Sequence, residues 1–87
     1  SDNLKDDNSK TLDQVVTEEQ RKKNLMKMID QLPDIHREII MMIELSGMSY
    51  NDASKYLDIP VGSIKSRLSR ARDELYLLVE KNMELFL

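Results

Sequence analysis

The sequence has no cysteine, only two glycines and two prolines, and a single Phe with three Tyr among its 87 residues. Without cysteine there is no disulfide framework and no thiolate metal site, which suits a reducing cytoplasm. So little glycine and proline leaves few candidates for β-turns and favours helices. Because aromatic residues are scarce, the core has to be filled mainly by Leu, Ile and Met.

Long apolar runs are also lacking. No stretch approaches the roughly 20 apolar residues that a helix needs to cross a bilayer, and the polar N-terminal residues do not resemble a signal peptide. We therefore expect a cytoplasmic protein that does not insert into a membrane. A hydrophobic fraction of 40% and a charged fraction of 33% are typical of a globular chain, and the length allows one domain.

The formal net charge of −3 argues against binding nucleic acid through overall charge. The distribution of charge is uneven, however, because residues 61–72 carry four basic groups and no acidic one. At physiological salt the Debye length is only about 8 Å. A local basic patch can therefore attract a phosphate backbone although the total is negative.

Apolar spacing and capping signals predict four helices and hence an all-α fold. Residues 1–16 are interpreted as a flexible linker or the cut edge of a longer protein, and residues 17–87 as the domain. Thr17 and Gln20 have the form of a capping box and begin the first helix, which Pro33 ends. Pro33 also opens a second helix that Gly47 stops. We expect this helix to be buried on more than one side, since it contains Ile35, Ile39, Ile40, Met41, Met42, Ile43 and Leu45.

Residues 49–72 have the form of a helix-turn-helix, because a short helix, a sharp break and a longer basic helix follow one another. Ser49 is the expected N-cap of the short helix, and Asp58 with Pro60 makes the break. The inward side of the short helix is expected to contain Ala53, Tyr56 and Leu57. The long helix has an apolar stripe of Ile64, Leu68, Ala71, Leu75 and Leu78. The apolar tail that follows, residues 77–87, either packs back on the bundle or awaits a partner.

The start of the long helix has the residues that DNA recognition needs. Small residues, Gly62 and Ser63, permit close approach, and free N–H groups at a helix start can meet a phosphate. One turn further on, the side chains of Lys65, Ser66 and Arg67 can reach base edges. Arg70 and Arg72 lie deeper along the helix, where contact with flanking phosphates is expected.

Other residues that could suggest a catalytic or metal-binding role are better explained as structural or surface residues. His36 is the only histidine and has no cysteine beside it, so neither a metal site nor a catalytic role is expected. Met41, Met42 and Met48 are interpreted as core residues. The serines of the long helix lack a general base. We expect no enzyme activity, no cofactor and no metal.

Three segments resemble the C-terminal DNA-binding domain, region 4, of bacterial sigma factors, and the extracytoplasmic-function (ECF) group most closely. They are LPDIHREII at residues 32–40, GMSY at residues 47–50 and IPVGSIKSRLSRAR at residues 59–72. The resemblance implies recognition of the promoter element near −35, binding to the β flap of RNA polymerase, and inhibition by an anti-sigma factor. It implies DNA contacts at Ser63, Lys65, Ser66, Arg67 and Arg70.

The sequence departs from this family at three positions. Asp58 stands in place of a common glycine, Ser54 in place of a small alanine, and His36 in place of an aromatic residue. The hydroxyl of Ser54, if buried, requires a hydrogen-bond partner. Asp58 places a negative charge near the face that is expected to contact DNA. Nothing in the sequence matches the sigma-factor domain that melts the promoter.

Two alternatives remain open from the residues. The first is a sigma-like interaction module that binds an anti-sigma factor and no longer binds DNA, which the net charge favours and the retained basic residues oppose. The second is the helix-turn-helix output domain of another transcriptional regulator.

Overall fold

The computed structural model describes residues 15–87, and every structural statement below concerns these residues. The chain forms α2 (Glu18–Asp30), α3 (Asp34–Ile40), the π-helix η1 (Met41–Leu45), α4 (Tyr50–Leu57), α5 (Val61–Lys81) and the 3₁₀-helix η2 (Met83–Leu85). The predicted all-α fold is confirmed, and no strand occurs within residues 15–87. Most of the predicted linker, residues 1–14, lies outside the described residues, so the boundary at residue 17 stays a prediction.

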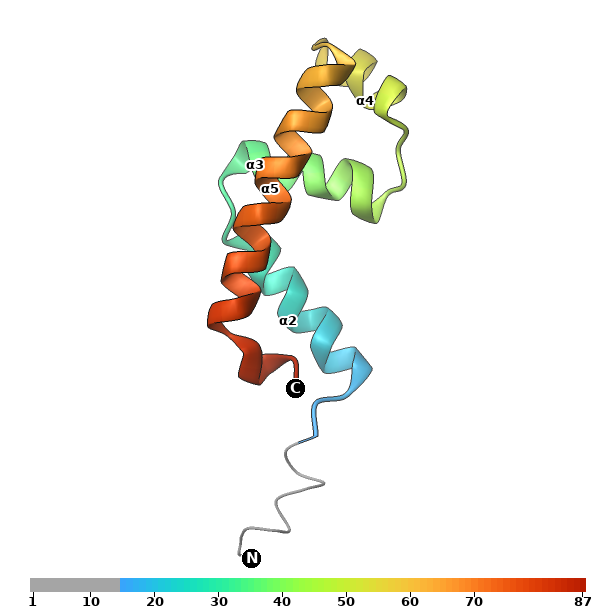
Figure 1. The fold of residues 1–87 in the computed structure, drawn as a ribbon. Coiled ribbons are helices and arrows are strands. Elements are labelled where there is room, and N and C mark those ends of the chain that lie inside the picture. Colours follow the sequence, from blue (N-terminus) through green and yellow to red (C-terminus); the bar gives the residue numbers. More distant parts are fainter. Residues whose placement is uncertain (1–14) are drawn as a thin grey trace, which may run out of the picture.

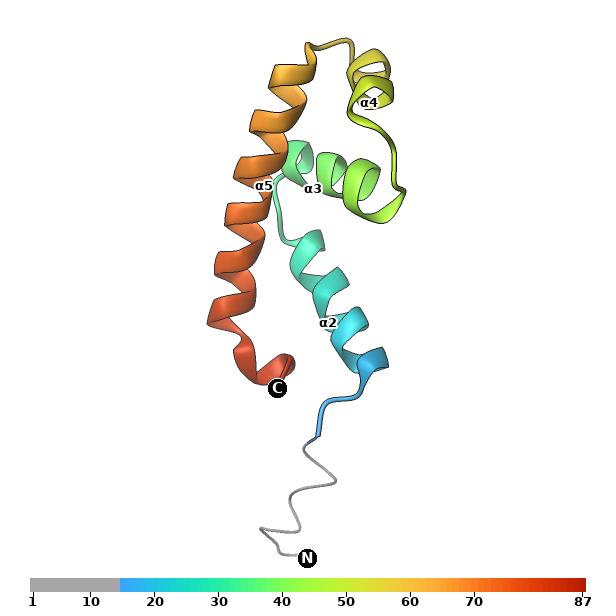
Figure 2. The same cartoon turned by 45° about the vertical axis from the view of Figure 1, so that its right-hand side comes forward.

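Helix α5 is the axis of the molecule, and the other helices pack against it (Figure 1). Helix α4 lies beside the N-terminal half of α5 and α2 lies beside its C-terminal half, while α3 and η1 cross between them (Figure 2). The helix-turn-helix of α4 and α5 is therefore held on a support made of α2 and α3.

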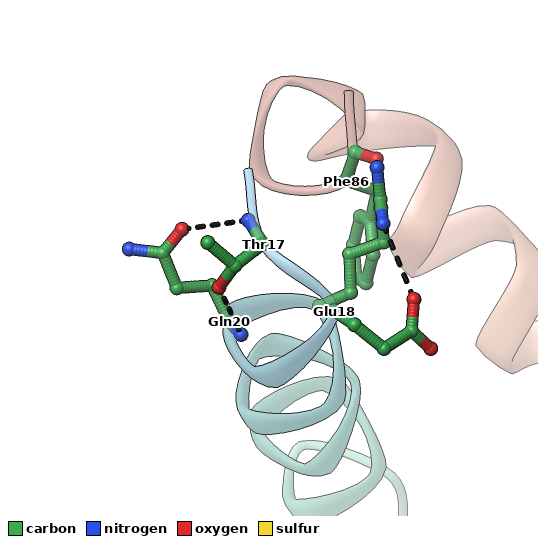
Figure 3. Close-up of polar contacts among 5 residues, drawn as sticks. Thr17, Glu18, Gln20 and Phe86 are labelled. Carbon is green, nitrogen blue, oxygen red and sulfur yellow. Dashed lines mark hydrogen bonds and ion pairs between the residues drawn. The ribbon is translucent and has the colours of Figure 1, made fainter. Parts of the chain in front are cut away.

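The helix boundaries follow from local chemistry. The Thr17 hydroxyl accepts the Gln20 N–H (3.1 Å), and the Gln20 side chain accepts the Thr17 N–H (2.9 Å), which confirms the capping box (Figure 3). The Ser49 hydroxyl accepts the Asp52 N–H at 3.0 Å and caps α4. Asp58 ends α4 in the left-handed conformation with φ of 56°, which Asp adopts more readily than most residues because its short side chain bonds locally.

The core consists of side chains from all four α-helices and η1. The predicted stripe of α5 is confirmed in its main part, because Ile64, Leu68 and Ala71 are almost fully buried and Leu75 is buried. The remaining buried residues are Met28, Ile29, Leu32, Ile39, Ile40, Met42 and Ala53. The core thus fills the space between α5 and the elements that pack along it.

The second predicted helix differs from expectation in two ways. From Met41 it continues as a π-helix, in which the Ser46 N–H bonds to the Met41 carbonyl at 2.9 Å. It is also buried on one side only, since Ile35, Met41 and Leu45 are 40–48% exposed. The wider π-helical turn shifts the later side chains away from a 3.6-residue stripe, and no element among residues 15–87 covers the outer side. The expectation of burial on more than one side is wrong.

Helix α4 also turns one predicted core residue outward. Ala53 is fully buried and Leu57 is half-buried, but Tyr56 is 72% exposed. A helix of only two turns contacts α5 and η1 along one narrow edge, which Ala53 and Leu57 occupy. The neighbouring Ser54 hydroxyl donates to the Ile59 carbonyl at 2.5 Å, so it has the partner that it was expected to need.

The tail packs back on the bundle. The Arg21 guanidinium donates from Nε to the Phe86 carbonyl (2.9 Å), and the Asn24 amide donates to the Leu85 carbonyl (2.9 Å). Leu85 and Phe86 are partly buried against the core. Phe86 lies beside the first turn of α2 (Figure 3). These contacts decide between the two interpretations of the tail in favour of packing.

Candidate nucleic-acid interface

The start of α5 is left without a side-chain cap. Pro60 is the N-cap residue and has an extended backbone (φ −62°, ψ 152°) with no N–H of its own. Its carbonyl accepts the N–H groups of Ser63 (2.9 Å) and Ile64 (3.1 Å). Within the described chain, the N–H groups of Val61 and Gly62 have no such acceptor. The helix start therefore presents free donors and the positive end of the helix dipole to an anion.

A polar hollow of about 320 Å³ lies beside this helix start. An α-helix turns about 100° per residue, so side chains three, four and seven residues apart lie on one face. This spacing brings together four of the six predicted contact residues and one glycine. The hollow is lined by Gly62, Ser63, Ser66, Arg67 and Arg70.

Gly62 keeps the hollow open. A Cβ atom placed on Gly62 would meet no other atom within 4 Å, and its φ lies outside the left-handed region. The fold therefore does not require a glycine at this position. What the glycine provides is a missing side chain at the place where a ligand's backbone or base edge would approach.

The two other predicted residues lie on the opposite flank of α5. The Lys65 ammonium group lies 5.7 Å from the centroid of the Tyr50 ring, at the side of α5 that faces α4. Such a contact restrains a flexible lysine through cation–π attraction. Lys65 is exposed and remains next to the helix start, although it does not line the hollow.

Arg72 is engaged within the protein. Its Nε donates to the Glu44 carboxylate, which η1 holds over α5. This hydrogen bond raises the pKa of the Arg72 guanidinium above its usual value. The structure thus does not bring Arg72 into the hollow, and a phosphate would have to compete with Glu44 for it.

Three partners of predicted residues were not found from the sequence. Tyr50 supports Lys65, Glu44 holds Arg72, and Glu74 contacts the His36 ring. Each pair joins residues from different helices, 15 to 38 positions apart, so no local spacing could indicate it. His36 is occupied by this contact between α3 and α5.

No group of three or more His, Cys, Asp or Glu side chains is placed to hold a metal ion in residues 15–87. Among the described helices, none is long and apolar enough to cross a membrane.

The chain is similar in sequence to known proteins over more than half of its length. The family described as Sigma-70, region 4, matches residues 22–75, which is more than half of the chain. The ECF RNA polymerase sigma factor EcfG of Rhodopseudomonas palustris (strain TIE-1) is 43% identical over 51 residues, 59% of this chain and 28% of that protein. The ECF RNA polymerase sigma factor SigC of Mycobacterium tuberculosis (strain CDC 1551 / Oshkosh) is 46% identical over 48 residues, 55% of this chain and 26% of that protein.

A third relative is the ECF RNA polymerase sigma-E factor of Escherichia coli (strain K12), 35% identical over 57 residues, 66% of this chain and 30% of that protein. The chain thus spans under a third of the length of these relatives. No solved structure shows a significant match to it.

Proposed function

Because the chain belongs to the sigma-70 region 4 family, we propose that it recognises the promoter element near −35 during transcription initiation. It does so as part of a sigma factor bound to RNA polymerase in the cytoplasm, with α5 in the major groove of the DNA. No enzymatic step belongs to this proposal.

The observation that carries the proposal is the hollow at the start of α5. It combines missing bulk at Gly62, hydroxyl groups, two cationic side chains and free backbone N–H groups. Arg67 and Arg70 make no ion pair with any described residue, so their charges are available to a nucleic acid. A major groove about 12 Å wide admits an α-helix in this way.

The position of each side chain along α5 decides whether we assign it a base or a phosphate contact. We assign contacts with base edges to Ser63, Ser66 and Arg67, because recognition helices read bases with their N-terminal residues. Arg70 stands a turn further along and is assigned a phosphate. Lys65 approaches the DNA from the other flank, where Tyr50 restrains it. Arg72 contacts a phosphate only when Glu44 releases it.

RNA polymerase has to bind a surface that remains free when α5 contacts DNA. A second hollow, of about 250 Å³, lies between α2, η1 and α5 and is lined mainly by apolar side chains, among them Leu25, Ile29, Leu45 and Leu75. None of its lining residues belongs to the basic hollow, but the paired Glu44 and Arg72 also line it, so Arg72 is available to DNA only when this surface is unoccupied. We propose it as the surface for the β flap of the polymerase, and for an anti-sigma factor that competes with the polymerase.

The interaction-only alternative is less well supported. A domain that no longer binds DNA has no need to keep two unpaired arginines beside an open helix start. The relatives are named as sigma factors, which also disfavours the output domain of another class of regulator.

Selection from a random duplex library tests the proposal, with the intact chain at several salt concentrations. We expect one short element to be enriched. Arg67→Ala should relax the sequence preference at one position, whereas Arg70→Ala should weaken binding to all sequences and lower the salt slope by about one. No binding to excess duplex at low salt, or a preference unchanged in Arg67→Ala, would overturn it.

A further inference from the structure

A third surface of the protein takes no part in the proposed contacts with DNA and RNA polymerase. A groove of about 870 Å³ runs between α3 and α4, and its apolar lining includes Ile35, Met41, Met48 and Tyr56. It shares no lining residue with the basic hollow or with the second hollow, which is proposed for the polymerase. A ligand in this groove therefore need not displace DNA.

Three large apolar residues of this groove are exposed. Ile35 is 45%, Met41 40% and Tyr56 72% exposed, and they come from three elements, α3, η1 and α4. A cluster of large apolar side chains at one surface marks an interaction site more often than a scattered exposed residue does. Methionine at the floor of such a groove adapts to the shape of an incoming side chain, because it is unbranched and polarisable.

The edge of the groove is acidic. Asp30, Asp34 and Glu38 line it together with Arg37. The Arg37 guanidinium is already bound to the Asp34 carboxylate and to the carbonyls of Asp30 (3.2 Å) and Leu32 (3.1 Å). The side-chain carboxylates of Asp30 and Glu38 make no ion pair with the described residues. The edge thus presents uncompensated negative charge to a ligand.

From this combination we propose that the groove between α3 and α4 binds an amphipathic helix of a protein partner, whose apolar stripe is flanked by Lys or Arg. A helix with its side chains is about 10–12 Å across, and an apolar stripe in a groove is a common mode of helix recognition. The basic flanks would meet Asp30 and Glu38, which favours association and orientation. The same carboxylates repel a phosphate backbone.

The six methionines provide a test with its own control. Met41, Met42 and Met48 line the groove, whereas Met26, Met28 and Met83 do not. The chain, labelled at the methionine methyl groups, is titrated by NMR with a helix-forming peptide of about five turns that has a leucine stripe and lysine flanks. A second peptide carries the same stripe with glutamate flanks.

We expect the lysine peptide to shift the methyl signals of Met41, Met42 and Met48 and to bind at least about tenfold more tightly than the glutamate peptide. Shifts centred on Met83 or Met26, equal binding of the two peptides, or no binding at millimolar peptide would overturn the proposal.

Two variants and a control locate the site. Tyr56→Ser and Glu38→Gln should each weaken the lysine peptide several-fold, and Glu38→Gln should also reduce the salt dependence of binding. Leu77→Gln, at an exposed apolar residue of α5 outside the groove, should leave the affinity unchanged. If Leu77→Gln weakens the peptide as much as Tyr56→Ser does, the binding is not specific to the groove.

The test does not depend on the promoter proposal. DNA binding by Tyr56→Ser should equal that of the unaltered chain, because Tyr56 lies outside the basic hollow. Peptide binding by Arg67→Ala should likewise be unchanged. Failure of either proposal thus leaves the other standing.

Discussion

Replacing Gly62 by alanine separates the stability of the fold from DNA binding. The added Cβ meets no atom within 4 Å in the free protein, so the fold should accept it without rearrangement. Alanine is favoured over glycine within a helix by roughly 0.5–1 kcal/mol. Because Gly62 is only the second residue of α5, we expect the lower end of this range. The free energy of unfolding should rise by about 0.5 kcal/mol.

In the DNA complex the same methyl group is expected to weaken binding. It stands in the hollow beside Ser63 and Ser66, where the proposal requires the closest approach to the groove. Inserting a methyl group into a close-packed contact costs about 1–3 kcal/mol. Since about 1.4 kcal/mol is a factor of ten in affinity, Gly62→Ala should bind the selected duplex roughly 5- to 150-fold more weakly.

Urea unfolding followed by circular dichroism, and fluorescence anisotropy with a labelled duplex, measure the two quantities on one sample. Ser69→Ala, on the exposed side of α5 but outside the hollow, is the matched control and should change affinity little. Gly62→Leu should lose more affinity than Gly62→Ala. If both Gly62 variants bind DNA as the unaltered chain does, the hollow is not the contact surface. If Gly62→Ala unfolds more easily, the steric argument is wrong.

Three further predictions test other parts of the reasoning. Asp58→Gly should raise the free energy of unfolding by about 1 kcal/mol, because glycine adopts the left-handed conformation without a Cβ penalty. Asp58→Asn removes only the charge. It should bind DNA with the same affinity as Asp58→Gly but should not reach the stability of Asp58→Gly in urea. Glu44→Gln should lower the free energy of unfolding by less than about 1 kcal/mol, since the pair with Arg72 is partly exposed. The double variant Glu44→Gln/Arg72→Ala should have nearly the same urea midpoint as Arg72→Ala alone. Leu68→Ala, at a residue only 1% exposed, should cost about 2–5 kcal/mol in the same assay, and a loss below 1 kcal/mol would contradict its central place in the core.

Features that depend on neighbouring residues were predicted well. The capping box at Thr17, the cap at Ser49 and the break at Asp58 are each decided within a few residues. The stripe of α5 was also predictable, because one long helix with a regular spacing has one apolar face. The same spacing placed four of the six expected contact residues in one hollow.

Features that depend on which distant segment packs against a helix could not be predicted from local spacing. Nothing in the spacing of the second helix indicates that its outer side stays uncovered, so Ile35 and Met41 were expected inside. The π-helical turn of η1 changes the angle per residue within the segment. The pairing of Arg72 with Glu44 depends on how η1 lies over α5. Each of these outcomes is set by tertiary geometry.

The unbroken length of α5 has a mechanical consequence. Its 21 residues at 1.5 Å each make a rod about 31 Å long. The same rod carries the basic hollow at one end and supports α2 at the other (Figure 1). A slip of one base pair along B-DNA rotates a bound rod by about 34° around the duplex. The far end would then swing through an arc of more than about 10 Å. If α5 docks as proposed, the base pair read at its N-terminal end would therefore determine where the rest of the domain stands around the DNA.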